Sequence, residues 1–521
     1  MFWADKIRKD IQTTLTKKTE PFVVRDEKTA SGRVHVGSLR GVAIHDEIAQ
    51  LLSQDGTPAI FLYEINDIDP MDDIPSYLDE REYAQHLGKP LKDVPAPDGK
   101  SKNFAEQYAH EFMNVIKASG FTPEYYRASE LYTRGDMNDV ILTALDRADR
   151  IRTIYKEVSG SEKPEGWLPI HMICEKCGKV LTTKTLGWDG NEVQYQCMKE
   201  GGAGGSRGCG YEGSNSPFNG NATFPWKVEW AAKWAVVGVD IEGAGKDHST
   251  KGGARDVSNH IAREIFGYEP PYDIPYEFFL VGGAKMSSSK GAGDLASDVA
   301  ALLPVTILRV ALLGTRPMRA INFDVRGTTI PALFDRYDEI AEKYWSGAGD
   351  DDARLFERVH HSKVPEKYYR MRFSQVAFLS QMPHIDVFAV AAEEHGMELS
   401  EMEKAALEER VQYAQLWLNE YAPERYVFKL QSGEISIDLS DAQKRALTMI
   451  VEYLQENKQY TGEEFHKQLH AIKTETAIEP KEFFSALYQI FLGRDSGPQA
   501  GWFLSVLPQE YVLERLQHAL R

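Results

Sequence analysis

A strand–helix–strand pattern near the N-terminus constrains the fold most strongly. Residues 22–24 read as a short buried strand, and residues 38–54 carry apolar side chains at helical spacing. A second apolar run at residues 59–63 follows a turn signal at residues 55–58. Strand, helix and strand at this spacing form a βαβ unit, whose two strands run parallel. The chain is therefore predicted to be an α/β protein with a parallel sheet.

The same pattern recurs later in the chain, with strands predicted at residues 236–241 and 276–281 around a helix at residues 253–266. Two such halves predict one Rossmann-type domain over residues 1–300, interrupted by an insertion at residues 167–222. Beyond Pro304 long helical patterns dominate, with breaks at residues 346–352 and near residues 431–433. They predict a connecting region at 301–345 and helical subdomains at 346–432 and 433–521.

Charge and hydropathy narrow the class of protein. A net charge of −18 argues against a protein that coats nucleic acid indiscriminately, although local basic patches can still bind a specific RNA. No segment approaches the roughly 20 apolar residues of a membrane helix. The first residues also lack the cationic and apolar regions of a signal peptide. We expect a cytoplasmic protein without a membrane segment.

The four cysteines of the chain, Cys174, Cys177, Cys197 and Cys209, all lie within the predicted insertion. A Cys-x-x-Cys pair followed by two further thiols is typical of a tetrahedral Zn²⁺ site. Metal binding would fold a segment too polar to form its own core. Disulfides, which are rare in the cytoplasm, and unpaired thiols are the alternatives. We predict a structural zinc ion.

Basic residues gather between residues 358 and 372, interleaved with aromatic ones. The candidates for RNA contact are Arg358, Lys363, Lys367, Arg370 and Arg372, and the aromatic residues are Tyr368, Tyr369 and Phe373. Basic groups bind phosphates and aromatic rings stack on bases, so the segment suits a structured RNA. A solvated helix face explains the pattern equally well.

A glycine-containing turn joins the first strand to the first helix. It carries Ser31, Gly32, His35, Gly37 and Ser38. A helix that begins here directs its positive dipole end at a phosphate, and the two glycines allow close approach of a ligand. His35 can donate a hydrogen bond to phosphate oxygens. In isolation, this motif is also typical of a plain strand–helix turn.

A second loop follows the predicted strand at residues 276–281. It contains Lys285, Met286, Ser287, Ser289 and Lys290. Its two ammonium groups and its hydroxyls could close over a triphosphate, although a solvated loop has the same composition. Together, two such loops after strands of one divided domain predict an ATP site.

The two loops resemble the signatures of class I aminoacyl-tRNA synthetases, His-Ile-Gly-His and Lys-Met-Ser-Lys-Ser, with Ser38 and Ser288 as departures. Both departures fit the class I lysyl-tRNA synthetases. The resemblance to this family covers essentially the whole chain and includes the stretches at 66–69, 129–135, 226–230, 245–248 and 496–503. The resemblance implies a class I Rossmann-type catalytic domain with a zinc-ribbon-like insertion, followed by a mainly α-helical anticodon-binding region.

The function implied by this resemblance is that of a lysine–tRNA ligase. Such an enzyme uses ATP and Mg²⁺ to form lysyl-adenylate, requires tRNA before activation, and transfers lysine to the 3′-terminal ribose of tRNA(Lys). His35, Lys285 and Lys290 would hold the phosphates. We expect a monomer. The alternatives are a class I synthetase for arginine, glutamate or cysteine, and a non-catalytic RNA-binding relative.

The resemblance also implies an amino-acid site, composed of Glu27, Thr29, Trp226, Trp230, Asp247 and His248. His248 could bond a carboxylate, adenylate or ribose, whereas Asp247 could equally cap the next helix; Trp234 is expected in the core. Glu27 and Arg255 depart from the family, where a glycine and an aromatic residue are expected. Glu27 could pair with a lysine ammonium or point to solvent, and Arg255 would disfavour a cation if it faced the pocket.

Overall fold

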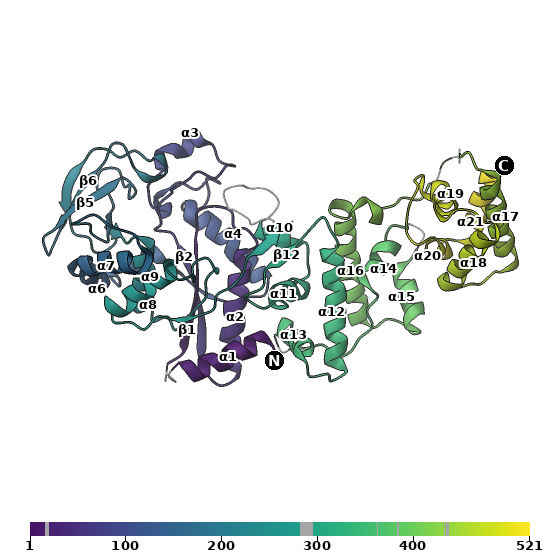
Figure 1. Ribbon diagram of the computed structural model, residues 1–521, viewed down its shortest axis with the longest axis horizontal. Helices are drawn as coiled ribbons and strands as arrows, with labels where there is room; N and C mark the ends of the chain where they lie inside the picture. Colours follow the sequence, from purple (N-terminus) through teal and green to yellow (C-terminus); the bar gives the residue numbers. More distant parts are fainter. Residues whose placement is uncertain (16–19, 282–294, 362, 383–384, 432, 434–436) are drawn as a thin grey trace. The chain divides into compact units, whose positions relative to one another are not determined.

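The computed structural model describes residues 1–521 except 16–19, 282–294, 362, 383–384, 432 and 434–436. The chain divides into two compact units. Unit 1 comprises Met1–Asp324 and Arg336–Glu366, and unit 2 comprises Val325–Asp335 and Lys367–Arg521. Helix α12 (Thr329–Trp345) therefore begins in unit 2 and ends in unit 1 (Figure 1).

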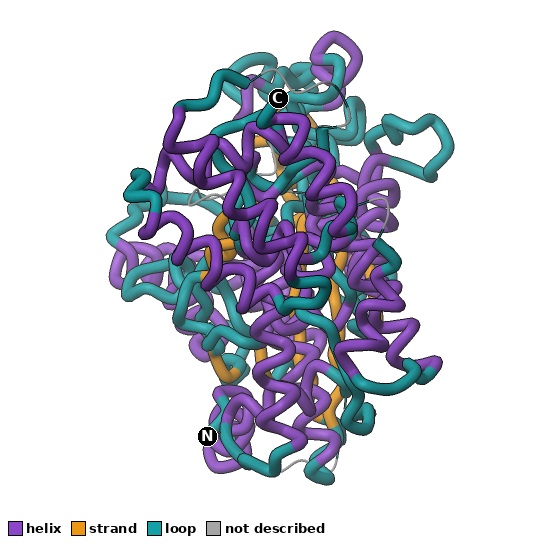
Figure 2. Tube along the Cα trace, turned by 90° about the vertical axis from the view of Figure 1, so that its right-hand side faces the viewer, coloured by secondary structure: helices purple, strands orange, loops and turns teal. Residues whose placement is uncertain are grey.

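The centre of unit 1 is a parallel sheet with strand order β10-β9-β1-β2-β3. Its strands are β1 (Phe22–Thr29), β2 (Ala59–Asn66), β3 (Glu124–Arg127), β9 (Ile241–Glu242) and β10 (Tyr272–Asp273). The described strands of the chain all lie in unit 1 and are orange in Figure 2. The predicted parallel α/β sheet is confirmed.

Two details of the predicted second half are wrong. Residues 236–241 were expected to form a strand, but helix α8 (Trp226–Val237) runs into them and ends at Gly238, whose φ of 75° favours glycine. The β-branched pair Val236 and Val237 misleads because it suits a strand but here forms the last turn of the helix. The strand expected at 276–281 is reduced to β11 (Phe279–Val281), which pairs with β12 (Ile321–Phe323) outside the main sheet.

Helix α2 (Ser38–Gln54) has the bounds that its apolar spacing predicts, and it contacts β1 and β2. The predicted helix at 253–266 is α9 (Ala254–Glu264). The other helices of unit 1 are α1 (Trp3–Thr14), α3 (Glu80–Tyr83), α4 (Phe104–Ala118), α5 (Ala128–Thr133), α6 (Asn138–Asp146), α7 (Ala148–Ser159), α10 (Ala296–Ala301), α11 (Val305–Leu313) and α13 (Asp351–Val359).

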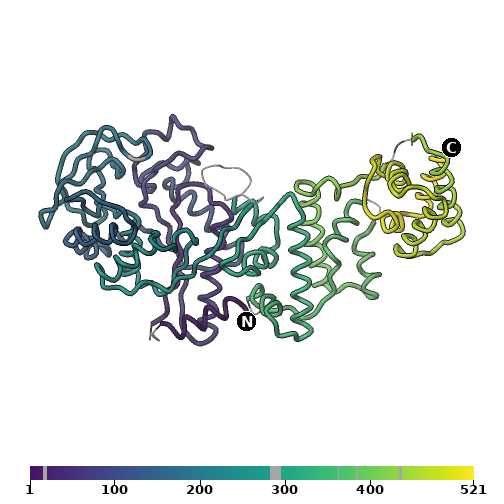
Figure 3. Tube along the Cα trace, viewed as in Figure 1, coloured from purple at the N-terminus to yellow at the C-terminus, as the bar shows by residue number. Residues whose placement is uncertain are grey.

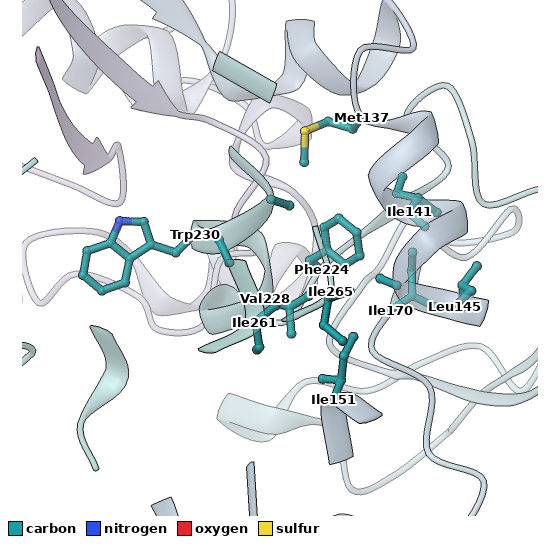
Figure 4. Close-up of a cluster of buried hydrophobic side chains, with 14 of the residues drawn as sticks. Met137, Ile141, Leu145, Ile151, Ile170, Phe224, Val228, Trp230, Ile261 and Ile265 are labelled. Atoms are coloured by element: carbon teal, nitrogen blue, oxygen red, sulfur yellow. The ribbon is translucent and has the colours of Figure 1, made fainter. Parts of the chain in front are cut away.

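The insertion is built from short antiparallel strands. Strand β4 (His171–Met172) pairs with β8 (Ala222–Thr223), and β5 (Thr183–Trp188), β6 (Val193–Cys197) and β7 (Glu212–Asn215) form a three-stranded sheet. Its buried residues Val193, Tyr195 and Cys197 join an apolar core formed with α5 to α9, part of which is shown in Figure 4. The insertion is therefore packed on the rest of unit 1 through a shared core.

The regular secondary structure described in unit 2 is helical, in agreement with the predicted helical region. Its helices after α12 are α14 (Phe373–Leu379), α15 (Val387–His395), α16 (Glu401–Glu420), α17 (Asp441–Glu456), α18 (Gly462–Glu475), α19 (Pro480–Leu492), α20 (Ala500–Ser505) and α21 (Gln509–Ala519), which can be followed by residue number in Figure 3. Capping boxes at Ser400, Ser440 and Thr461 start three of them. None of the described helices has the length and apolar character needed to span a membrane.

Candidate active site

A cavity of about 340 Å³ opens at the carboxyl ends of β1 and β9, within the range of small-molecule sites. Ligands of open parallel sheets bind at this edge. The cavity brings together these residues of the predicted site: Glu27, His35, Gly37, Ser38, Trp226, Trp230, Asp247 and His248. Lys28, Tyr63, Glu242 and Tyr276 also line it.

Other predicted site residues lie elsewhere. Ser31, Gly32 and Thr29 are not among the residues that line the cavity. The Thr29 hydroxyl donates to Asp69 Oδ2 at 2.6 Å. Gly32 has a φ of 151°, and a Cβ there would come within 2.7 Å of the Tyr77 hydroxyl, so the position requires glycine. Lys285, Met286, Ser287, Ser289 and Lys290 lie outside the described residues.

The first signature is continuous with α2. The N–H groups of Ser38, Leu39 and Arg40 donate to the carbonyl oxygens of His35, Val36 and Gly37, at 3.1, 2.9 and 3.2 Å. His35 also forms an isolated antiparallel bridge with Leu295, and the N–H of Ala296 donates to the Val34 carbonyl at 2.9 Å. Because these bonds tie the start of α10 to the first signature, the chain that follows the second loop is anchored beside the pocket.

Three tryptophans at helical spacing on α8 form a row behind and beside the cavity. The rings of Trp226 and Trp230 stack with centroids 6.0 Å apart, and Trp234 is 5.3 Å from Trp230. Figure 4 shows the Trp230 indole pointing away from the side chains of Ile141 and Leu145. Trp226 is 50% exposed at the cavity and Trp234 is fully buried, which confirms the prediction that Trp234 belongs to the core.

His248 faces this row from the loop after β9, where it follows Asp247. The His248 ring meets Trp226 and Trp230 edge-on, with centroids 5.7 and 6.2 Å away. The residue that caps α9 is Gly253, so capping of α9 does not explain Asp247. Both loop residues are thereby placed at the cavity wall.

A buried carboxylate, Glu242, connects the tryptophan row to the sheet. It accepts hydrogen bonds from Trp230 Nε1 at 2.6 Å, Trp234 Nε1 at 2.9 Å and Arg25 Nη1 at 2.8 Å. Arg25 in turn bonds Glu64 at 2.6 Å and also pairs with Glu27. The strand β1 thus carries a guanidinium that holds three carboxylates at once.

Lys233 of α8 extends this network. Its ammonium contacts Glu64 at 2.5 Å and Glu229 at 3.0 Å, and Glu229 also accepts from the Tyr132 hydroxyl at 2.6 Å. We call Arg25, Lys233, Glu27, Glu64, Glu229 and Glu242 the pocket network. In it two cations face four carboxylates, so that it carries an excess of negative charge.

Glu27 and Glu64 of the pocket network titrate very differently. Burial raises the pKa of Glu27 to about 7, although Arg25 opposes this shift. Burial acts in the same direction on Glu64, but Arg25 and Lys233 outweigh it and lower the pKa of that carboxyl. At neutral pH Glu64 is therefore ionised, whereas Glu27 lies at the midpoint of its titration.

Arg255 does not line the cavity. Its guanidinium lies behind the tryptophan row, 5.1 Å from the Trp234 ring and 5.7 Å from the Trp230 ring. It donates to the Pro271 carbonyl at 3.0 Å and is 3.3 Å from Asp273. The repulsion of a cationic substrate that would follow from an arginine facing the pocket therefore does not arise.

Comparison with known sequences identifies the family. The sequence profile described as tRNA synthetases class I (K) matches residues 1–366, which cover more than half of the chain and include every residue of the cavity. This chain belongs to the class I tRNA synthetases (K). A second profile, described as an anticodon binding domain, matches residues 405–520 of this synthetase, within unit 2.

Relatives match the synthetase along its whole length. The lysine–tRNA ligase of Methanosarcina barkeri is 32% identical, with 99% of this chain and 97% of the relative aligned. Those of Archaeoglobus fulgidus and Thermoplasma acidophilum are 31% and 30% identical, each over 100% of this chain and at least 99% of the relative. Among solved structures, a glutamate tRNA ligase from Elizabethkingia meningosepticum is 13% identical, covers 96% of this chain and 99% of its own, and has a TM-score of 0.43.

The cysteines of the synthetase converge on one point. Their four Sγ atoms lie within 4.8 Å of one another, and the pairs Cys174–Cys209 and Cys177–Cys197 are each separated by 3.6 Å. Four thiolates about 2.3 Å from a tetrahedral zinc ion would be roughly 3.8 Å apart, whereas a disulfide requires about 2.05 Å. The Cys209 N–H, 3.3 Å from Cys197 Sγ, supplies the outer hydrogen bond typical of such sites. The donor set therefore fits one metal ion.

The basic segment at 358–372 is not one continuous surface of the synthetase. Arg358 is fully buried and bonds Glu47 at 2.6 Å and Gln54 at 2.5 Å, so the interpretation of this residue as an RNA contact is wrong. It serves instead to hold α13 to α2. Lys363 and Lys367 are exposed, Arg370 lies over the Tyr368 ring, and Arg372 pairs with Asp335 at 2.7 Å.

Sequence reasoning missed most of the pocket network. Arg25, Glu64, Glu229, Lys233 and Glu242 come from four separate elements and have no common motif. The sequence contained one local signal for these residues. In β1 and β2, charged residues directly follow apolar ones, and the strand continues through them where a solvated loop would be expected. Charged residues inside a central strand require buried partners.

Proposed function

We propose that this class I synthetase joins lysine to tRNA(Lys). The lysine carboxylate attacks the α-phosphorus of ATP, the bond from that phosphorus to the oxygen bridging to the β-phosphate breaks, and pyrophosphate leaves. A hydroxyl of the 3′-terminal ribose then attacks the lysyl carbonyl and AMP leaves. No side chain acts as a nucleophile, because positioning and charge stabilisation suffice for this chemistry.

The observation that most supports lysine as the amino-acid substrate is the net charge of the pocket network. Two buried cations face four carboxylates, and one of these, Glu27, lies at the cavity wall with a raised pKa. An entering ammonium compensates this excess and restores the ionised form of Glu27. A glutamate substrate would add a further negative charge, and a cysteine side chain would add no compensating positive charge.

The remaining lining residues complete the proposed site. Trp226 and Trp230 cover the aliphatic stem of the substrate, as aromatic rings do for lysine chains. His35, Gly37 and Ser38 bind the phosphates at the start of α2, together with Lys285 and Lys290 of the second loop, and His248 and Asp247 bind the polar end of the amino acid. Mg²⁺ accompanies ATP and supplies positive charge to its phosphate oxygens.

The proposed partners outside the pocket are a zinc ion and the tRNA. The cysteine cluster fits a structural zinc ion that holds the insertion together. The helices that match the anticodon-binding profile would receive the anticodon, and Lys363, Lys367, Arg370 and Arg372 would contact the RNA backbone. Basic side chains at these positions give the salt dependence expected of phosphate contacts.

The deciding experiment is tRNA charging by the purified protein with each of the twenty amino acids, ATP, Mg²⁺ and total tRNA. We expect charging with lysine that is lost in Lys285→Ala. Charging with arginine, the other cationic amino acid, would keep the mechanism and overturn the specificity. No charging by folded, zinc-loaded protein with cognate tRNA would favour a non-catalytic RNA-binding relative.

A further inference from the structure

We propose that Lys28 is a catalytic residue that binds a phosphate group of ATP. This inference rests on the proposed use of ATP, but not on the identity of the amino acid. Lys28 follows Glu27 on β1, and successive residues of a strand point to opposite faces of the sheet. The two residues nevertheless line the same cavity, because the strand ends there.

The two faces of β1 differ in the partners that they offer. On the face of Arg25 and Glu27 the charges of the pocket network are held by α8. On the other face Asp26 already has neighbours: its Oδ1 accepts from the Glu27 N–H at 2.9 Å, and its Oδ2 is 3.7 Å from His45 Nδ1. Lys28 shares this second face with Asp26, toward α2.

The Lys28 ammonium has no hydrogen-bond acceptor or ion-pair partner among the residues that the structure describes. Burial lowers its pKa, an effect that Asp26 opposes without reversing it. Lys233 of α8 contrasts with it because that ammonium contacts two carboxylates. Lys28 is partly buried, and a cation that has lost part of its hydration without gaining a partner, at the wall of a substrate cavity, favours the binding of an anion there.

The surroundings favour a phosphate as this anion. Lys28 lines the cavity together with His35, Gly37 and Ser38, where the 17-residue helix α2 begins. The positive end of a helix dipole attracts phosphate, and a lysine beside it adds a full charge. The carboxylate of the amino acid is the competing anion, so the test must separate the two.

In the activation step the ammonium remains protonated. As a carboxylate oxygen of the amino acid bonds to the α-phosphorus and pyrophosphate departs with the electron pair of the broken bond, negative charge moves to the phosphate oxygens. A fixed cation beside them stabilises this charge without giving up a proton. Lys28 therefore acts on binding of ATP and on the rate of activation together.

The test compares Lys28→Met with Lys28→Arg and with Lys9→Met, a control at an exposed position of α1. Thermal unfolding is recorded with adenosine, AMP and ATP, in the absence of amino acid and tRNA. We expect ATP to raise the Tm of the wild type more than that of Lys28→Met, whereas adenosine shifts both equally. Lys28→Arg should recover most of the ATP-dependent shift, because it keeps the charge.

Charging kinetics give the second readout. Removing one charge-stabilising group costs about 100-fold in rate, so we expect a loss of that order in kcat/KM for ATP in Lys28→Met. The KM for the amino acid should change less than about twofold, as expected when that substrate makes no contact with the ammonium. The unliganded variant should be at least as stable as the wild type, because methionine replaces an unpartnered charge with an apolar chain.

Three results would overturn the assignment. They are an unchanged ATP shift with unchanged kcat/KM for ATP, a rise confined to the KM for the amino acid, and a fall in the Tm of unliganded Lys28→Met that accounts for the lost activity. The proposed function is judged separately, by which amino acid the wild type attaches to tRNA. A protein that binds ATP through Lys28 and charges no tRNA would retain this inference and lose the proposed function.

Discussion

Two regions of unit 1 bring polar groups into close contact, and these groups find their partners in different ways. The pocket network joins charges of opposite sign from β1, β2, α8 and β9, so that its members are partners of one another. The cysteine cluster brings together four thiols that have the same chemistry. Groups of one kind repel once ionised and need a cation between them. The first region therefore folds with the sheet, whereas the second is suited to hold the zinc ion that we propose.

The largest expected effect is the loss of that metal. Structural zinc contributes about 10–16 kcal/mol in small zinc-binding domains, so Cys177→Ser should lower the zinc content and expose the insertion to local unfolding. Amide hydrogen exchange should accelerate in β5, β6 and β7 while β1 and β2 stay protected. Metal analysis of the wild type gives the reference stoichiometry. Equal exchange rates in wild type and variant would show that the insertion folds without an ion.

Breaking the pocket network should have the second-largest effect on stability. Lys233→Met leaves Glu64 and Glu229 without their shared cation, and loss of one partner of a buried pair costs about 3–5 kcal/mol. Chemical denaturation measures this change in the free energy of unfolding. The matched control is Lys246→Met, which removes an ammonium that is 44% exposed and 2.6 Å from Glu277, and should cost less than about 1 kcal/mol. Similar losses of unfolding free energy in Lys233→Met and Lys246→Met would contradict the expected difference between a buried and an exposed ammonium.

Substrate affinity should depend on Glu27. Hydrogen bonds to charged groups contribute roughly 1.5–3 kcal/mol, so Glu27→Gln should raise the KM for lysine by about 10- to 150-fold. Glu27→Asp should retain part of the affinity, and the KM for ATP serves as the internal control. An unchanged KM for lysine in Glu27→Gln would place the ammonium elsewhere in the cavity.

The pH dependence of the affinity for lysine tests the role of the Glu27 carboxylate without mutation. Its pKa of about 7 in the unliganded protein is raised from the ordinary 4.5, so Glu27 is neutral below pH 7 and ionised above it. The affinity for lysine should therefore rise as pH increases through 7 and level off above, by at most about tenfold per pH unit. The charges facing Glu27 are Arg25, Lys233, Glu64 and Glu242. Glu27→Gln should flatten the profile in this range, and an identical profile in the variant would assign the titration to another group.

The contrast between the two regions also explains how far the sequence alone could lead. The cysteines lie close together in the chain, and the spacing of Cys174 and Cys177 is itself a signature of metal binding. The parallel sheet was equally readable, because β1, α2 and β2 are consecutive. Arg25, Glu64 and Lys233 meet only after the sheet has formed, and nothing in their local sequence specifies which charges become partners.

Burial is the other property that local patterns did not reveal. Arg358 belongs to a basic, aromatic segment that reads as an RNA contact, yet its guanidinium is buried against Glu47 from a helix 311 residues away in the chain. Arg255 reads as a charge near the pocket and lies instead behind Trp234. The sequence indicates where charges are, and the fold decides which of them meet solvent or substrate.

The smallest expected effect separates the two tryptophans of the pocket wall. Trp226 is half exposed, so Trp226→Leu should raise the KM for lysine about fivefold or less and leave the Tm unchanged, because little buried apolar area is lost. Trp230→Leu removes in addition the indole N–H that Glu242 accepts at 2.6 Å, which leaves a buried carboxylate short of a donor. Thermal unfolding and lysine kinetics on both variants should therefore show the larger loss in Trp230→Leu. Equal losses of Tm and lysine affinity in the two variants would mean that the hydrogen bond from Trp230 to Glu242 contributes nothing to stability or binding. The pocket network and the aromatic row would then act independently.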